Sequence, residues 1–515
     1  MKNIVETIVV SASQMQQIEE QIFQAGMPVA ALMEKAARLC VDRLKSLYPL
    51  ADYQKIGILV GPGHNGADAL VMARELFLAG YEIKIFRPFF KLKPLTNQHT
   101  NYAASLGITS SEEIQSLQEC QLIVDGLFGF GLTKELPANL IEVLNLVNAW
   151  HKPIVSIDLP SGIHTDTGTV LGSAIKATHT FCLGLWKQAF FEDSALEYLG
   201  QSIRIDLGIR PHHIWSVLTQ PAPTKQVTKE IALKYLPLPR PAVTYKYRQG
   251  HLLLICGSRQ YAGAAILAAL GARSSGVGML SVAVPESLKT LLVSHLPEAL
   301  IIDCPENKEG AISSIPIAVT NLNKFQAIAC GPGLSTAADS LVNKILQSEC
   351  PLVLDADALN ILAQENAVEV LASREYPTVL TPHEGEFKRL FPEIATDIED
   401  RLSAVTTAAQ QSQTTILLKG AKTAIANPDG LTWLIRESTP ALARGGSGDV
   451  LTGLVGGLVA QENQPKNDSL FNLVASGAWW HAQAGISAAA ELSELGVDAT
   501  TLTQYLTPTI SQYLK

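Results

Sequence analysis

The chain contains 515 residues, too many for one hydrophobic core, and this length predicts roughly two to four domains. Hydrophobic residues make up 47% of it and charged residues 17%, as in well-buried globular domains, and the net charge of −9 argues against a nucleic-acid surface. The seven cysteines form no CxxC pair, the N-terminus is a poor signal peptide, and no apolar run is as long as a membrane span of about 18 residues. We therefore expect a cytoplasmic protein with reduced thiols and without a zinc site.

The first half of the chain predicts a parallel sheet. Residues 11–47 have helical spacing and are followed by a strand at 55–60, a glycine-rich loop at 61–68, a helix at 69–79 and a strand at 81–86. Two further strands, at 121–125 and 153–158, each end in an aspartate. Each strand end alone is typical of a turn or a helix cap. Because ligands bind outside the carboxyl ends of parallel strands, we expect the three ends together to line one crevice.

Asn65, Asp125 and Ser161 lie at these strand ends and offer only oxygen ligands. This ligand set carries one full negative charge and contains no sulfur or imidazole. It therefore favours a weakly held monovalent cation over a transition metal. His64 has no partner at metal-ligand spacing, and we interpret it as a loop histidine near a ligand.

The proline-rich segment 236–241 predicts a linker, which we place at residues 221–245 between domains at 1–220 and 246–515. The second half again has buried strands, at 251–256, 328–330, 352–357, 378–380 and 415–419, each followed by a polar or glycine-rich loop. This pattern predicts a second doubly wound sheet with its ligands at one edge. The halves show no alignable repeat, which indicates a fusion.

The stretch 443–453, ARGGSGDVLTG, predicts a tight loop that opens a buried helix. Free backbone N–H groups at such a helix start bind anions, and the helix dipole favours the ionised form of Asp449 in the first turn. A carboxylate beside a phosphate site can remove the proton of an attacking hydroxyl, as kinases require. The alternative is an ordinary glycine turn with Asp449 as a cap.

The motifs of the second half, GPGL, DADALN, TPHEGE, LLKGAKT and GGSGDVLTG, resemble the ADP- or ATP-dependent NAD(P)H-hydrate dehydratases of the ribokinase-like superfamily. Those of the first half, GPGHNGADAL, DGLFGFGLTKELP and IDLPSGIHTDTG, resemble the NAD(P)H-hydrate epimerase domain. The resemblance implies an α/β protein with two doubly wound domains, a Rossmann-like three-layer αβα domain followed by a ribokinase-like αβα domain. Fused in this order, they resemble bacterial bifunctional enzymes that repair nicotinamide cofactors.

The implied activities are epimerisation of (R)- and (S)-NAD(P)HX and ADP-dependent dehydration of the S form to NAD(P)H, with release of AMP and phosphate. Asp449 would be the catalytic base of the dehydratase, and Asp158 would act in the epimerase near the inverted carbon. The implied ligands are K⁺ on Asn65, Asp125 and Ser161, Mg²⁺ in the dehydratase, ADP as co-substrate, and NADHX and NADPHX as substrates of a homo-oligomer without nucleic-acid or membrane partners. The substrate-binding residues would be Asp158, Asp449 and His64, Asn65, Gly66, Ala67, Asp68, Gly129, Phe130, Gly131, Leu132, Thr133, Lys134, Glu135, Gly263, Ala264, Gly333 and His383. The nucleotide-binding residues would be Lys419, Gly420, Ala421, Lys422, Thr423 and Gly448.

The chain departs from the family at two places. Ala67 and Ala69 replace glycines of the first loop, and because alanine tolerates positive φ poorly we expect that loop to be reshaped. Lys134 stands where the family often has arginine, which keeps the charge but loses bidentate geometry. Two alternatives remain open: a ribokinase-like small-molecule kinase fused to a non-catalytic Rossmann-like domain, and an active dehydratase joined to a silent N-terminal domain.

Overall fold

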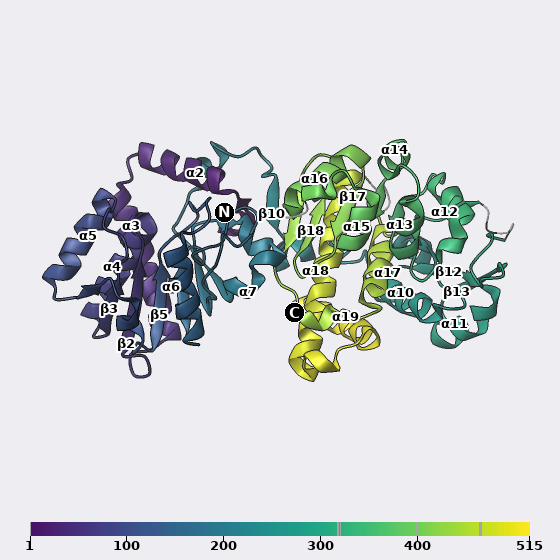
Figure 1. Cartoon of the computed structure of the whole chain (residues 1–515). Helices are drawn as coiled ribbons and strands as arrows, with labels where there is room; N and C mark the ends of the chain where they lie inside the picture. The colour runs from purple at the N-terminus through teal and green to yellow at the C-terminus, as the bar shows by residue number, and fades with distance from the viewer. Residues whose placement is uncertain (1, 317–318, 320, 398–399, 463–465, 515) are drawn as a thin grey trace. The chain divides into compact units, whose positions relative to one another are not determined.

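The computed structural model describes residues 2–514 except 317–318, 320, 398–399 and 463–465 (Figure 1). The chain divides into two compact units, residues 1–223 and 224–515. This boundary corrects the predicted linker, because residues 224–235 belong to the second unit. There they form β10 (Thr224–Gln226), which pairs with a strand of the sheet, and α9 (Lys229–Tyr235), which packs on a long helix. Residues 238–248 are exposed, as a linker would be.

The first unit is built on a seven-stranded sheet in which every pair of neighbours is parallel. The strand order reverses between β2 and β5, so β2 lies inside the sheet and the chain winds outward from it in both directions. This is the doubly wound topology predicted from the sequence. In spatial order the strands are β4 (Ser110–Ser111), β3 (Glu82–Phe86), β2 (Lys55–Val60), β5 (Leu122–Gly126), β6 (Ile154–Ile157), β7 (His179–Leu183) and β9 (Gln201–Ile205).

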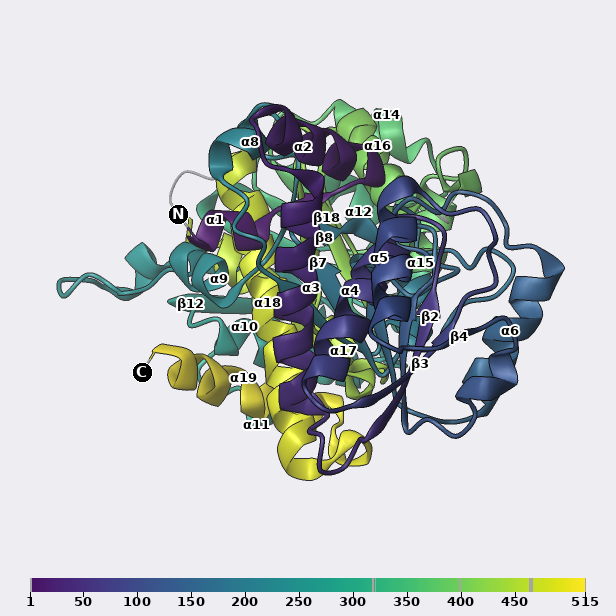
Figure 2. The ribbon, with the colours of Figure 1, turned by 90° about the vertical axis from the view of Figure 1, so that its left-hand side faces the viewer.

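Helices cover both faces of this sheet. One face carries α2 (Ala12–Gln24), α3 (Val29–Leu47) and α4 (His64–Leu78), with α3 beside α4 (Figure 2), and the other carries α6 (Ala138–Ala149). The start of α2 is fixed by a capping box between Ser11 and Gln14 and by a bond from Ala12 N to Asp166 Oδ1 of 2.7 Å. The remaining elements are α1 (Lys2–Thr7), α5 (Pro94–Ser105), α7 (Leu196–Leu199), α8 (Pro211–Trp215) and the parallel pair β1 (Val9–Val10) and β8 (Trp186–Lys187).

The second unit contains a ten-stranded sheet whose order reverses between β11 and β14. Most neighbours are parallel, but β17, β18 and β19 form antiparallel pairs that the sequence did not predict. In spatial order the strands are β10, β19 (Thr432–Ile435), β18 (Thr423–Ala426), β17 (Thr415–Leu418), β16 (Thr378–Leu380), β15 (Leu352–Leu354), β14 (Ala327–Cys330), β11 (His251–Ile255), β12 (Met279–Pro285) and β13 (Leu300–Cys304).

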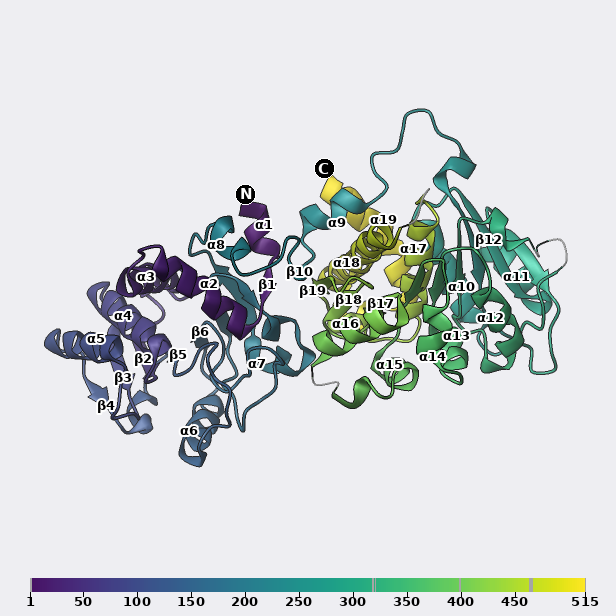
Figure 3. The same cartoon turned by 90° about the horizontal axis from the view of Figure 1, so that it is seen from above.

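One helical layer of this unit, seen in Figure 3, contains α9, α10 (Ala262–Ser274), α17 (Ser447–Val459), α18 (Asn467–Leu492) and α19 (Ala499–Leu514). Across the sheet lie α12 (Asp339–Leu346), α13 (Ala356–Leu362), α14 (Ala367–Ala372), α15 (Glu384–Leu390) and α16 (Arg401–Ser412), while α11 (Lys289–His295) lies beside β13. A Cβ at Gly453 would lie 1.8 Å from the Ala268 carbonyl oxygen, so the backbones of α17 and α10 are nearly in contact. The buried helix predicted after the loop at 443–453 is confirmed. No helix among the described residues is both long and apolar enough to cross a membrane.

Candidate active sites

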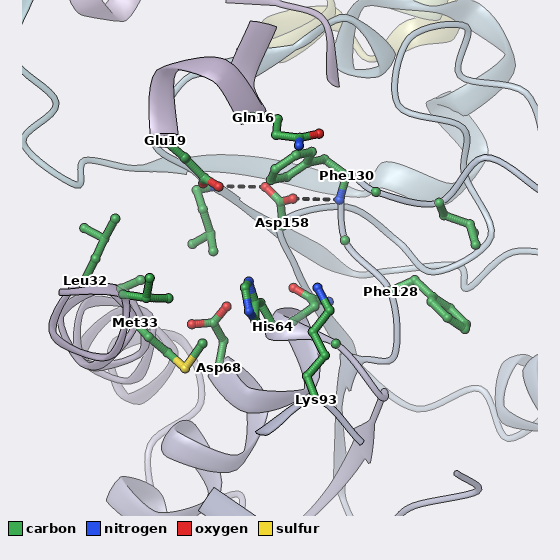
Figure 4. Close-up of a pocket in the computed structure, with 18 of the residues that line it drawn as sticks. Gln16, Glu19, Leu32, Met33, His64, Asp68, Lys93, Phe128, Phe130 and Asp158 are labelled. Atoms are coloured by element: carbon green, nitrogen blue, oxygen red, sulfur yellow. Dashed lines mark hydrogen bonds between the residues drawn. The ribbon is translucent and has the colours of Figure 1, made fainter. Parts of the chain in front are cut away.

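A pocket of about 550 Å³ opens in the first unit, at the carboxyl ends of β2, β5 and β6 (Figure 4). The strand order reverses at β2 and β5, and ligands of doubly wound sheets bind at such a reversal. The loops after both strands contribute to its wall, and α2 and α3 close it. Its polar lining includes Gln16, Glu19, Glu20, His64, Asn65, Asp68, Lys93, Asp158 and Lys187.

Asp158 lies in this pocket directly after β6 and is only 3% exposed. Its φ of +69° is unusual for a residue other than glycine, and backbone strain of this kind clusters at functional sites. Phe130 N donates to its Oδ2 at 3.0 Å, and Lys187 Nζ donates to its Oδ1 at 2.6 Å. Burial alone would lower the pKa of Lys187, but the interaction with Asp158 opposes this effect, and the pKa is raised overall. The pocket therefore contains a buried Asp–Lys ion pair.

Two more carboxyl groups lie beside this pair. Glu19 comes from α2 and Asp68 from α4, and Figure 4 shows both pointing toward the cavity that Asp158 faces. Burial raises the pKa of Glu19 to about 7, against the effect of Lys187 and with that of Asp158. Burial, followed by the charges of Asp158 and Glu19, raises the pKa of Asp68 well above its usual value. The pocket can therefore supply protons as well as accept them.

The loop with alanine replacements is not reshaped as the sequence suggested. α4 begins at His64, five residues earlier than predicted, and neither Ala67 nor Ala69 has a positive φ. Alanine favours a helix, so both replacements fit their positions. Of the predicted residues here, His64, Asn65 and Asp68 line the pocket, whereas Gly66 and Ala67 are buried beneath it.

The loop after β5 contributes the opposite wall. Gly129, Phe130, Gly131 and Leu132 line the pocket, while the predicted residues Thr133, Lys134 and Glu135 are exposed beyond it. A Cβ at Gly129 would lie 3.1 Å from both Asn65 Oδ1 and Asp158 Oδ2. Glycine therefore lets the backbone pass between two polar side chains of the site.

The predicted cation ligands Asp125 and Ser161 lie together below this loop. Ser161 Oγ donates to Asp125 Oδ1 at 2.6 Å, and Ser161 N and Ser156 Oγ each donate to Oδ2 at 2.9 Å. Burial raises the pKa of Asp125 and the hydrogen bonds from Ser161 lower it, with burial the larger effect. Asn65 Nδ2 is buried and has no hydrogen-bond partner.

In the second unit, Asp449 lies in the first turn of α17, as predicted. Gly446, with a φ of +93°, precedes the helix, and no side chain caps it. Its free N–H groups are therefore available to an anion. The prediction that the helix dipole keeps Asp449 ionised needs correction. Burial, with the charge of Asp355, raises the pKa of Asp449 to about 7, and Lys419 opposes this only in part.

Lys419 directly follows β17 and lies within a cluster of carboxylates. Its Nζ lies 2.8 Å from Asp355 Oδ1 and 3.8 Å from Glu386 Oε2, and Thr452 Oγ1 donates to Asp355 Oδ2 at 2.6 Å. Burial alone would lower the pKa of Lys419, but the charges of Asp355 and Glu386 oppose this effect, and the pKa is raised overall. A Cβ at Gly448 would lie 3.4 Å from Lys419 Nζ, so the lysine faces the start of α17. An ammonium group, the helix N-terminus and the Asp449 carboxyl thus share one site.

The other predicted nucleotide-binding residues follow Lys419. Gly420 and Ala421 lie in the turn between β17 and β18, and Thr423 begins β18. Lys422 Nζ donates to the backbone carbonyl of Arg436, which holds its ammonium group against β19. The turn is therefore part of a hairpin, which the motif alone did not reveal.

The structure also brings together the predicted substrate residues Gly263, Ala264 and Gly333. A Cβ at Gly333, whose φ is +60°, would lie 2.7 Å from Ala264 Cβ, while one at Gly263 would meet no atom within 4 Å. His383 precedes α15, where its Nδ1 accepts from Gly385 N at 2.9 Å, and its backbone N donates to Glu386 Oε2 at 2.8 Å. No set of three or more His, Cys, Asp or Glu side chains among the described residues has the geometry of a metal site.

Several residues of these sites were not predicted. They are Glu19 and Lys187 in the first unit and Asp355, Glu386 and Thr452 in the second. Asp355, Glu386 and Thr452 lay within quoted motifs, and the position of Asp355 directly after β15 was an available signal. Glu19 and Lys187 belong to no motif.

Both units, each doubly wound with polar groups at a strand reversal, have the architecture of small-molecule enzymes. A family model described as YjeF-related protein N-terminus matches residues 29–189, and one described as NAD(P)H-hydrate dehydratase matches residues 252–508. The bifunctional NAD(P)H-hydrate repair enzyme Nnr of Synechocystis sp. is 54% identical over 506 residues, covering 98% of this chain and 95% of that one. The enzyme of the same name from Thermosynechococcus vestitus is 47% identical, covering 98% of each chain. The chain therefore belongs to the bifunctional NAD(P)H-hydrate repair enzymes.

Similar solved structures cover the second unit. The ADP/ATP-dependent NAD(P)H-hydrate dehydratase of Bacillus subtilis, co-crystallised with ATP and Mg²⁺, is 32% identical with a TM-score of 0.47, covering 56% of this chain and 97% of that one. A ribokinase-like superfamily protein of Enterococcus faecalis is 27% identical with a TM-score of 0.49, covering 56% and 96%.

Proposed function

We propose that this chain repairs hydrated nicotinamide cofactors in two steps. The first unit interconverts (R)- and (S)-NAD(P)HX, and the second dehydrates the S form with ADP to give NAD(P)H, AMP and phosphate. The observation that carries the proposal is the position of Asp449, beside Lys419 at the uncapped start of α17. The names and coverage of the relatives favour this function over the ribokinase-like small-molecule kinase with a silent first unit.

In the dehydratase, the N–H groups at the start of α17 and Lys419 hold the phosphoryl group that is transferred. Asp449 removes the proton of the substrate hydroxyl, whose oxygen attacks the β-phosphorus of ADP and displaces AMP. Loss of phosphate and of a proton from the neighbouring ring carbon then restores the dihydropyridine. A pKa of about 7 suits a general base at neutral pH, because about half the molecules are ready to accept the proton.

The hydrated nicotinamide nucleotide would bind at Gly263, Ala264, Gly333 and His383, and the hairpin turn 419–423 with Gly448 would hold ADP. Mg²⁺ is normally bound by one or two carboxylates and by nucleotide phosphates, not by an all-protein cage. Asp355 and Glu386 next to Lys419 fit that requirement. The ion would neutralise the phosphates, while ADP remains the expected donor over ATP.

In the epimerase, Asp158 acts at the carbon that is inverted, and K⁺ binds Asn65, Asp125 and Ser161. The donor set fits K⁺, because all three supply oxygen and only one carries a full charge. The buried, unpaired amide end of Asn65 supports this assignment: rotation of the amide by 180° would place its oxygen there. K⁺ would order the loop after β5 and bind substrate oxygen. Association into a homo-oligomer remains a prediction.

Two substitutions in the full chain test the division of labour. Asp449→Asn should abolish dehydration and leave interconversion of the epimers intact, because the base is lost and the first unit is untouched. Asp158→Asn should slow interconversion and leave dehydration of the purified S form unchanged. Each chain is assayed for both activities, by separation of the epimers and by recovery of reduced-nicotinamide absorbance. Loss of both activities in either variant would contradict two independent sites.

A further inference from the structure

The first unit has more titratable groups in its pocket than the Asp158–Lys187 ion pair requires. Glu19 projects into the cavity from α2, toward Asp158 (Figure 4). This helix lies outside the segment that the family model matches, residues 29–189, and no motif marks it. The capping box at Ser11 and the bond from Ala12 N to Asp166 hold it against the pocket. The glutamate is therefore a fixed part of the wall.

Resting on the proposed epimerase function, we propose that Glu19 is the general acid of the first unit and works opposite Asp158 as the base. Asp158 accepts hydrogen bonds from Lys187 Nζ at 2.6 Å, Phe130 N at 3.0 Å and Leu183 N at 3.4 Å, and these three donors stabilise a proton acceptor there. Among the described residues Glu19 accepts no comparable set of donors, and its side chain is half-buried in the pocket wall. When two carboxyl groups of one pocket lie in different environments, one can act as the acid and the other as the base.

The chemistry needs both groups. The hydrated ring carries its hydroxyl on a carbon bonded to the ring nitrogen, so the ring opens when the hydroxyl proton moves to Asp158 and the C–N bond breaks. The electron pair of that bond goes to nitrogen, which takes the proton of Glu19, and the product is an aldehyde. Rotation about the adjacent C–C bond exposes the other face of the aldehyde. Re-closure returns one proton to Glu19 and one from Asp158 to oxygen, so the step is balanced and both residues are restored.

Glu19 lies among several charged groups of the pocket. Asp158, Asp68, His64 and Lys93 line the same cavity (Figure 4), the charge of Lys187 acts on Glu19, and Gln16 and Glu20 neighbour it on α2. An efficient general acid has a pKa near the working pH. Burial brings the pKa of Glu19 to about 7, which meets this requirement, and burial also raises the pKa of Asp68.

The experiment compares Glu19→Gln with Glu142→Gln in the full chain. Glutamine keeps the shape of Glu19 but has no proton to donate, so the enzymatic rate of epimerisation at pH 7 should fall by about 10²–10⁴-fold with KM changed little. Glu142 is exposed on α6 and does not line the pocket, so its variant should remain within about twofold of wild type. Dehydration of the S form by the same preparation shows that the variant chain is folded.

The pH profile separates an acid from a structural residue. Because Glu19 must be protonated, wild-type kcat/KM for epimerisation should fall about tenfold per pH unit above about 7, and Glu19→Gln should lose this limb. A variant with wild-type rate, or one that keeps the limb, would overturn the role of Glu19 while leaving the epimerase function standing. A wild-type chain that dehydrates the S form but never interconverts the epimers would overturn the function and this role together.

Discussion

Replacing Asp449 by asparagine should make the second unit more stable while it removes dehydration. Burial raises the pKa of this carboxyl from 3.8 to about 7, so the folded state favours the protonated form. The contribution of this carboxyl to the free energy of unfolding is fully present below pH about 4, and it is lost as the pH rises through about 7. At about 1.36 kcal/mol per unit, the loss at pH 8 is about 4 kcal/mol. Asparagine carries no charge and escapes this loss.

We therefore expect Asp449→Asn to unfold at a higher temperature than wild type at pH 8, with a gain in stability of up to about 4 kcal/mol that disappears near pH 4. Calorimetry of the ligand-free chain at several pH values measures it. Asp339→Asn is the matched control, because Asp339 also lies in the first turn of a helix, α12, but is exposed. Its pH dependence should follow wild type.

The same variant should lose about 10²–10⁴-fold in the rate of dehydration, as expected when a general base is removed. In wild type, kcat/KM should rise about tenfold per pH unit below about 7 and level off above it, because the base must be ionised. A variant less stable than wild type at pH 8 would refute the reasoning. It would mean that the helix dipole and Lys419 stabilise the Asp449 charge more than burial opposes it.

Three other results are expected. Gly453→Ala should destabilise the second unit by about 3 kcal/mol, since its Cβ would lie 1.8 Å from Ala268 O and force α17 away from α10; an unchanged thermal transition would contradict this. Lys187→Met should destabilise the first unit by about 3–5 kcal/mol and suppress epimerisation, because it leaves the Asp158 charge buried without a partner, and denaturant titration would measure it. Replacing K⁺ by Li⁺ in the assay should slow epimerisation but not dehydration. Equal epimerisation rates in both salts would contradict a K⁺ site at Asn65, Asp125 and Ser161.

The strands and the edges where they end were predictable because the signal is local. The run 55–60 is apolar, bounded by glycine, and forms β2 with those limits, and 378–380 forms β16. Glycine and aspartate at the strand ends then fix where a parallel sheet can bind a ligand. Asp158 was identified in this way and directly follows β6, whereas Asp449 was identified from the glycine loop before a helix and lies in the first turn of α17.

The remainder depends on contacts between distant segments. Lys187 and Glu19 reach the pocket from a short strand and a separate helix, and neither position has a distinctive neighbouring sequence. The dipole argument for Asp449 used only its own helix, whereas its pKa is raised first by burial and then by carboxylates from other elements. Similarly, the alanines of the first loop looked unfavourable only while that segment was taken as a loop and not as the start of α4.

The most direct test of the account gives the purified chain a mixture of (R)- and (S)-NADHX with Mg²⁺, K⁺ and ADP, and follows recovery of reduced-nicotinamide absorbance. We predict complete recovery, with the R form consumed faster than it epimerises spontaneously, and AMP and phosphate formed in equal amounts. Parallel reactions with ATP identify the preferred donor. Recovery that stops at the S fraction would contradict an active first unit, and no recovery with either nucleotide would contradict the repair function.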